Sequence, residues 1–143
     1  MAIDHGSGID SMSRKILGII PARGGSKRIP GKNLKNIDGR PLIAHTVEQA
    51  ALSRRLHRTI VSTDDEKIKQ AVIDYGGEVP FDRPSELATD TAKTREVITH
   101  VLDILEDQGE YFDIVCKIQP TNPLRLPQDI DEAIDRLDRK SVV

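Results

Sequence analysis

The stretch Ile16-Leu-Gly-Ile-Ile-Pro-Ala-Arg-Gly-Gly-Ser-Lys-Arg-Ile-Pro-Gly-Lys-Asn33 decides how the rest of the chain is interpreted. Its first five residues form an apolar run, which is typical of a buried strand in a parallel sheet. The part after Pro21 is a loop that combines glycines with cationic side chains: Gly24, Gly25 and Gly31 with Arg23, Lys27, Arg28 and Lys32. Adjacent glycines let backbone N–H groups approach a ligand closely, and successive N–H groups form an anion site. The stretch therefore predicts a polyphosphate site directly after a buried strand.

The loop matches neither of the two commonest phosphate-binding motifs. In a Walker loop aligned on Gly31-Lys32, Ser26 would stand at the first glycine position, and Asn33 replaces the Ser or Thr that binds magnesium. The loop also lacks the Gly-x-Gly-x-x-Gly spacing of dinucleotide-binding folds. We therefore expect neither a P-loop ATPase nor a dehydrogenase.

The distribution of charge favours a small phosphate-rich ligand over a nucleic acid. The formal net charge of the 143 residues is −2, which is not typical of a nucleic-acid-binding protein. Eleven Lys and Arg residues lie between positions 14 and 58 against two acids, whereas the rest of the chain carries ten basic and twenty-one acidic residues. Positive charge is thus concentrated around the glycine loop.

Other features of the sequence bear on its compartment and its boundaries. Cys116 is the single cysteine, which excludes an intrachain disulfide, favours a reducing, cytoplasmic location, and is expected to pack in the core. No segment resembles a membrane span. Residues 1–13 are polar and rich in Gly and Ser, and we expect them to be a leader ahead of a natural start at Met12. The folded domain is then expected to cover residues 14–143.

Strands and helices are expected to alternate along this domain. Strands are predicted at 16–20, 59–62 and 114–118, with a brief one at 78–79 and another opening at 141–143. Helices are predicted from Pro41 to about Ser53, after a capping box Thr63-x-x-Glu66, over 97–105 and from Pro127 onward. This alternation predicts a three-layer α/β/α, Rossmann-like domain with a mostly parallel sheet. The loops 23–33, 62–65 and 119–125 leave the carboxyl ends of the strands and are expected to form one site.

Four segments together resemble a known family. They are Pro-Ala-Arg-Gly-Gly-Ser-Lys-Arg-Ile-Pro-Gly-Lys-Asn (21–33), Val-Ser-Thr-Asp-Asp (61–65), Arg-Pro-Ser-Glu-Leu-Ala-Thr-Asp-Thr (83–91) and Gln-Pro-Thr-Asn-Pro-Leu-Arg (119–125). In this order they closely resemble the acylneuraminate cytidylyltransferases, also called CMP-sialic acid synthetases. The 3-deoxy-manno-octulosonate cytidylyltransferases resemble the chain in the glycine loop but not in the last segment.

The resemblance implies a magnesium-dependent transfer of CMP from CTP to a nine-carbon α-keto acid sugar, with release of pyrophosphate. It implies that the triphosphate and ribose are held by Arg23, Gly24, Gly25, Ser26, Lys32 and Asn33. Among these, Arg23 and Lys32 are expected to stabilise the charge on the phosphates during catalysis. Arg83 and Thr94, which replaces an expected Ser, would lie against the base and sugar, and Gln119 would lie between the nucleotide and the acceptor.

Several alternatives stay open at this stage. Asp64 and Asp65 either bind magnesium or cap a helix, and capping is the expectation because helix N-termini favour acids. Arg125 binds the acceptor carboxylate or, as we expect, pairs with acids of the following helix. The chain is expected to be an incomplete family member that lacks the metal ligands and the homodimer contact of the downstream part. It is therefore a cytidylyltransferase when complete, a non-catalytic nucleotide-binding fragment or truncated paralogue, or a nucleotidylyltransferase with another acceptor such as 3-deoxy-manno-octulosonate.

Overall fold

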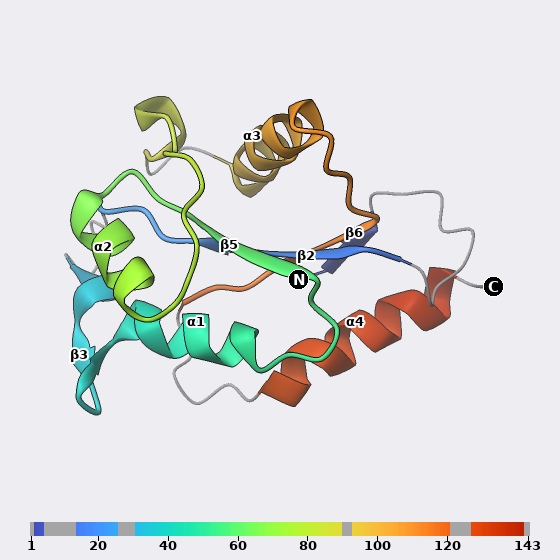
Figure 1. Ribbon diagram of the computed structural model, residues 1–143, viewed down its shortest axis with the longest axis horizontal. Helices are drawn as coiled ribbons and strands as arrows, with labels where there is room; N and C mark the ends of the chain where they lie inside the picture. The colour runs from blue at the N-terminus through green and yellow to red at the C-terminus, as the bar shows by residue number, and fades with distance from the viewer. Residues whose placement is uncertain (1, 5–13, 26–30, 90–92, 121–126, 142–143) are drawn as a thin grey trace.

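A four-stranded sheet forms the centre of the protein (Figure 1). The structure is a computed structural model that describes residues 2–4, 14–25, 31–89, 93–120 and 127–141. The strands β1 (Ala2–Asp4), β2 (Ile16–Pro21), β5 (Arg58–Ser62) and β6 (Ile114–Lys117) lie in the order β1-β6-β2-β5. β2 pairs in parallel with both β5 and β6, and β1 pairs antiparallel with β6. The predicted parallel arrangement of the three apolar strands is thus confirmed.

Helices cover both faces of this sheet, as the alternation along the chain predicts (Figure 1). α1 (Leu42–Ala51), α2 (Glu66–Asp74) and α4 (Pro127–Ser141) contribute to the core on one face, and α3 (Thr94–Asp107) covers the other. Successive strand residues point to opposite faces, so Ile16 and Ile20 pack toward α1, while Leu17 and Ile19 pack toward α3. Cys116 is buried in the first of these cores, as expected.

A short hairpin separates the glycine loop from α1. It consists of β3 (Asn36–Ile37) and β4 (Arg40–Pro41), which pair antiparallel. The two turn residues, Asp38 and Gly39, have φ values of 53° and 84°. Positive φ at both central positions is the geometry of a tight two-residue hairpin turn, which Asp-Gly favours. Pro41 therefore belongs to a strand and precedes α1, rather than being its first helical residue.

Other predicted boundaries differ from the structure. Residues 78–79 do not form the expected strand, although the Glu78 carbonyl accepts one backbone hydrogen bond from the Val61 N–H, at 2.8 Å. Ser141 is the last residue of α4 rather than the start of a strand, and residues 142–143 lie outside the described part. Residues 2–4, which the sequence analysis leaves outside the fold, pair with β6.

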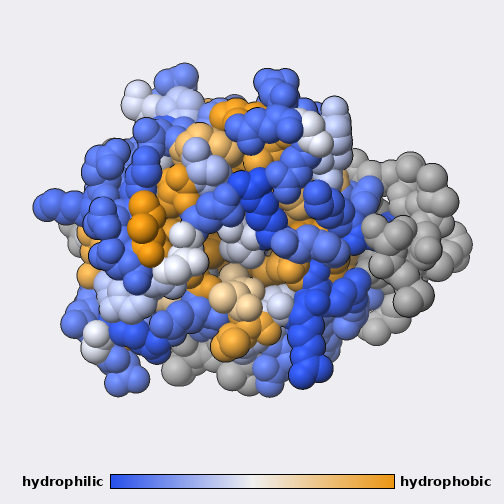
Figure 2. Space-filling model, in the orientation of Figure 1, coloured by the Kyte–Doolittle hydropathy of each residue, from blue (hydrophilic) through white to orange (hydrophobic). Residues whose placement is uncertain are grey.

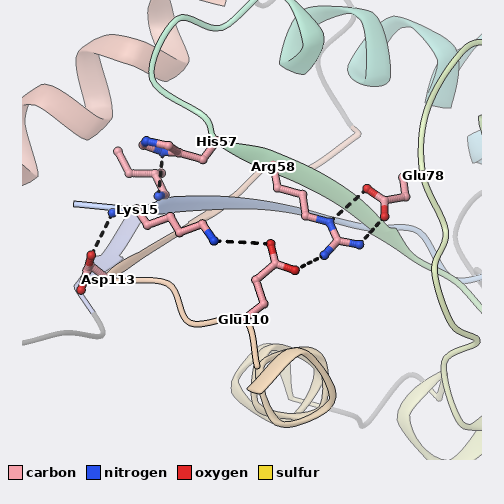
Figure 3. A network of polar contacts seen from close by, with 7 residues as sticks. Lys15, His57, Arg58, Glu78, Glu110 and Asp113 are labelled. Atoms are coloured by element: carbon pink, nitrogen blue, oxygen red, sulfur yellow. Dashed lines mark hydrogen bonds and ion pairs between the residues drawn. The ribbon is translucent and has the colours of Figure 1, made fainter. Parts of the chain in front are cut away.

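A network of charged side chains joins the segments at the amino ends of the parallel strands (Figure 3). Glu110 pairs with Arg58 and lies 3.7 Å from Lys15 Nζ, and Arg58 also pairs with Glu78. The hydrogen bonds to Glu78 raise the pKa of the Arg58 guanidinium, against the effect of burial. Asp113 accepts a hydrogen bond from the Lys15 N–H at 2.8 Å. These contacts hold the three strands together at the end of the sheet opposite the glycine loop.

The visible face of the molecule in Figure 2 carries hydrophobic side chains in separate patches among hydrophilic ones. Among the residues that the structure describes, the exposed large hydrophobic ones are Leu52, Ile73, Tyr75 and Tyr111. In the described part of the chain, no helix is both long and apolar enough to cross a membrane.

Candidate nucleotide-binding site

A pocket of about 200 Å³ lies beyond the carboxyl ends of β2 and β6. The glycine loop and the first residues after β6 line it, as is usual for loops at this edge of a parallel α/β sheet. Of the other residues expected there, 62–65 contact the glycine loop without lining the pocket, and 121–125 lie outside the described part. Six of the predicted site residues line the pocket: Arg23, Lys32, Asn33, Arg83, Thr94 and Gln119. It is lined further by Ile19, Pro21, Leu87, Thr89, Val97, Ile98, Lys117 and Pro120. Ser26 and Arg125 lie outside the described residues, so nothing follows about their predicted roles.

The start of the glycine loop is held against the turn between β5 and α2. The Ala22 N–H donates to the Ser62 carbonyl at 2.9 Å, and the Gly24 N–H donates to Asp64 Oδ1 at 2.9 Å. Arg23 Nη1 donates to the Gly25 carbonyl at 2.5 Å. Gly24 and Gly25 thus lie beside the pocket, and Arg23 lines it from the loop that they form.

The two acids of this turn have different roles. Asp65 is the N-cap of α2, and its Oδ1 accepts hydrogen bonds from the N–H groups of Lys67 and Ile68 at 2.7 and 3.1 Å. The predicted capping role is therefore correct for Asp65, whereas Asp64 binds the glycine loop instead. The prediction that a capping box begins at Thr63 is wrong. Thr63 lies two residues ahead of the N-cap, and its Oγ1 accepts from the Asp65 N–H rather than from a helical N–H.

Gly24 must be a glycine because the cap of α2 lies against it. A Cβ atom at this position would lie 2.5 Å from Asp65 Oδ2 and 2.8 Å from Asp65 Cβ, which is closer than van der Waals contact. At Gly25, by contrast, a Cβ would lie within 4 Å of no atom in the described part of the chain. The two adjacent glycines are therefore required to different degrees.

The far end of the glycine loop enters a short 3-10 helix, Lys32–Leu34, after Gly31 at a φ of 70°. Asn33 is 6 % exposed, and its Nδ2 donates to the Arg23 carbonyl at 3.3 Å. Its Oδ1 atom is buried without a hydrogen-bond partner among the described residues. A buried carbonyl oxygen that lacks a donor carries a desolvation cost. A donor on a bound ligand, such as a ribose hydroxyl, would remove that cost.

Arg83 is built into the wall of the pocket. It is 6 % exposed; its Nη2 donates to the Ser62 carbonyl at 2.9 Å and its Nε to Ser62 Oγ at 3.0 Å. Nη1 donates to the Leu87 carbonyl at 3.3 Å. Burial lowers the pKa of the guanidinium, nearby Asp64 raises it, and Arg23 lowers it further. Arg83 thus joins the end of β5 to the segment before α3.

On the side of α3, the wall of the pocket contains Lys117, which the sequence analysis missed. Thr94 is the first residue of α3, and its Oγ1 accepts a hydrogen bond from Lys117 Nζ at 3.1 Å. Lys117 ends the apolar strand β6. A single lysine within a run of buried apolar residues was the available signal, because such a side chain needs a polar destination.

The charge of the pocket favours an anionic ligand. Of its described lining residues, four are cationic (Arg23, Lys32, Arg83 and Lys117) and none is acidic. The described residues include no group of three or more His, Cys, Asp or Glu side chains arranged to hold a metal ion. Proteins bind magnesium through one or two carboxylates together with substrate phosphates. The described lining therefore does not fit a magnesium site by itself.

Comparisons with known proteins agree with this geometry. The profile of a family described as cytidylyltransferase matches residues 17–142. The chain is 43% identical over 134 residues to the CMP-N,N'-diacetyllegionaminic acid synthase of Legionella pneumophila, covering 90% of this chain and 56% of that protein. It is 40% identical over 123 residues to the N-acylneuraminate cytidylyltransferase of Escherichia coli, covering 86% of this chain and 28% of that protein.

A solved structure gives the same result for the fold. The structure of CMP:2-keto-3-deoxy-manno-octonic acid synthetase complexed with CTP superposes with a TM-score of 0.71 at 28% identity, covering 86% of this chain and 47% of that one. The chain thus spans about half or less of the length of these three proteins. Because the family profile covers nearly all of the sequence, the chain belongs to the cytidylyltransferase family.

Proposed function

We propose that this chain forms the CTP-binding part of an enzyme that transfers CMP from CTP to a nine-carbon α-keto acid sugar and releases pyrophosphate. One observation carries the proposal: a cationic pocket lies at the carboxyl ends of the parallel strands and is lined by six of the predicted site residues. The names of the similar proteins, which make CMP-activated acidic sugars, support the same reaction.

The proposed chemistry depends on positioning and on neutralising charge. The acceptor hydroxyl attacks the α-phosphorus of CTP and releases its proton to solvent, the bond from the α-phosphorus to the oxygen shared with the β-phosphate breaks, and pyrophosphate leaves with the electron pair of that bond. Phosphoryl-type transfers of this kind need little covalent help from the protein. Arg23 and Lys32 are proposed to bind the phosphates, Arg as a bidentate donor and Lys as a point charge. Gln119, which is exposed at the mouth of the pocket, is proposed to lie where the acceptor meets the nucleotide.

Other parts of the proposal concern the complete protein. The similar proteins act on different sugars by their names, so a legionaminic, pseudaminic or sialic acid is proposed as the acceptor class, with 3-deoxy-manno-octulosonate as the alternative. We propose a requirement for Mg²⁺ on the ground that a triphosphate is usually bound together with this ion. A homodimer is proposed from the family resemblance. A cytoplasmic location is proposed because the single cysteine of the sequence is buried and excludes an intrachain disulfide.

The reaction is tested by incubating the chain with CTP, Mg²⁺ and each candidate sugar and measuring released pyrophosphate. The control omits the sugar, and a Lys32→Ala variant serves as the matched protein control. We expect sugar-dependent release from the unsubstituted chain that exceeds release from the variant. If pyrophosphate is released equally without sugar, or by both proteins, the proposed reaction is wrong.

A second candidate function is nucleotide binding without turnover. The observation that favours it is the absence of any carboxylate from the described lining of the pocket. This function predicts CTP binding by the chain with no pyrophosphate release in the presence of any of the sugars.

A further inference from the structure

Lys117 stands where the pattern of the sheet calls for an apolar residue. It is paired in register with Ile19 of β2, and the neighbouring pair on the same face is Leu17 and Val115. Those three apolar residues are at most 1 % exposed and pack in the core under α3. Lys117 therefore extends from the α3 face of the sheet into the pocket, where its Nζ donates to Thr94 Oγ1.

The lining of the pocket comes from two chemically different parts of the chain, which we call its glycine-loop end and its α3 end, and Lys117 is connected with the second. The glycine-loop end carries Arg23 and Lys32, which suit a triphosphate. The α3 end is walled by apolar side chains, which suit the flat faces of a base: Ile19, Leu87, Val97 and Ile98. Lys117 belongs to the α3 end, because its partner Thr94 begins the helix that carries Val97 and Ile98.

We propose that Lys117 is a specificity-determining residue that donates a hydrogen bond to the acceptor edge of the cytosine base. This inference rests on the proposed function, because it assumes that CTP occupies the pocket. A lysine ammonium offers three donors and no acceptor, and one donor is directed at Thr94. Cytosine presents acceptors at both O2 and N3, whereas N3 of uracil carries a hydrogen. Because O2 accepts in both bases, it is a hydrogen bond from Lys117 to N3 that favours cytosine over uracil.

The test compares ligands that share the phosphates but differ in the base. Affinities of CTP and UTP are measured by calorimetry, and the affinity of inorganic tripolyphosphate is measured by displacement of CTP. The variants are Lys117→Met, which suits the apolar row of the strand, and Lys117→Gln, which keeps a donor without the charge. Arg136→Met is the matched control, because Arg136 is an exposed cation on α4, the helix on the other face of the sheet. Circular dichroism and thermal melting establish that each variant is folded.

For Lys117→Met we expect CTP affinity to fall by about tenfold or more, as for a lost hydrogen bond from a charged donor. Tripolyphosphate affinity is expected to stay unchanged, and the preference for CTP over UTP to shrink. The CTP affinity of Lys117→Gln is expected to lie between those of Lys117→Met and the unsubstituted chain. The CTP affinity of Arg136→Met is expected to match that of the unsubstituted chain.

Two results would overturn the inference while leaving the proposed function intact. An equal loss for CTP and tripolyphosphate would make Lys117 a phosphate ligand, and an unchanged CTP affinity in both Lys117 variants would remove it from recognition altogether. If the unsubstituted, folded chain binds no nucleotide, the proposed function itself fails, and the inference fails with it.

Discussion

Replacing Gly24 by alanine tests the packing of the glycine loop on the helix cap most directly. The new Cβ would lie 2.5 to 3.0 Å from three side-chain atoms of Asp65. Asp65 cannot move freely, because its carboxylate caps α2 through Lys67 and Ile68. If Asp65 yields, the cap is weakened, at a cost of about 0.5–2 kcal/mol. If the loop yields, the hydrogen bond from Gly24 to Asp64 is lost, at about 1 kcal/mol. We expect Gly24→Ala to lower the free energy of unfolding by about 1–3 kcal/mol, the usual range for overpacking.

The chain offers a matched control at the next position. Gly25→Ala places its Cβ in open space, and the backbone there is not in the left-handed region. This variant is expected to be neutral or to stabilise the protein by up to about 1 kcal/mol, because alanine restricts the unfolded chain. Both proteins are compared by urea denaturation, with the free energy of unfolding as the measured quantity.

A third variant identifies the cause of the loss. All three close contacts belong to the Asp65 side chain, so Asp65→Gly removes them, and glycine at an N-cap costs only a few tenths of a kcal/mol. In that background, Gly24→Ala is expected to cost less than about 0.5 kcal/mol. If Gly24→Ala and Gly25→Ala have the same effect on the free energy of unfolding, or if Asp65→Gly does not relieve the loss, close packing of Gly24 on the Asp65 side chain is not the cause.

Three further predictions concern single side chains. Lys32→Ala is expected to weaken CTP binding by about 1.5–3 kcal/mol, measured by calorimetry, and an unchanged affinity would remove Lys32 from the phosphate site. Asp64→Asn retains an oxygen that accepts from the Gly24 N–H, so we expect little change in the free energy of unfolding measured with urea. Asp64→Ala should lower that free energy by about 1 kcal/mol. Equal losses in the two variants would contradict the hydrogen bond's role. Burial raises the pKa of Asp131, but hydrogen bonds from Ser53 and from the backbone N–H groups of Arg54 and Arg55 lower it more, so the net pKa lies below its usual value. This stability is present above the unfolded pKa of about 3.9 and is lost as the pH falls through the folded value, so Asp131→Asn should be less stable at pH 7, with a difference that shrinks as the pH falls below the unfolded pKa.

Much of the fold could be predicted because its signals are local. The apolar run at residues 16–20 and the periodic apolar residues of α3 each specify one element and the face that it buries. The start of α2 was placed wrongly because Thr63 and Asp65 are both residue types that favour the N-cap, and in the structure it is the Asp65 carboxylate that accepts from the first helical N–H groups. The pairing of residues 2–4 could not be predicted, because three residues carry little pattern and their partner strand is over a hundred positions away.

The location of the site could be predicted more readily than the role of each residue in it. Parallel topology alone brings the three loops to one edge of the sheet. Two roles could not be predicted: Arg83 donates to the Ser62 carbonyl, and Asp64 accepts from the Gly24 N–H. Both hydrogen bonds depend on backbone positions that only the folded chain defines. Lys117 was missed because an apolar run was interpreted as core as a whole, although its one charged member lines the pocket.

Every role proposed for the cationic pocket depends on its binding CTP, which calorimetric titration of this chain measures. CTP is titrated with and without Mg²⁺, and ATP, GTP and UTP serve as controls. We expect saturable binding of CTP that is tighter than that of the other three nucleotides. A folded chain that binds none of them, or all four equally, would contradict it.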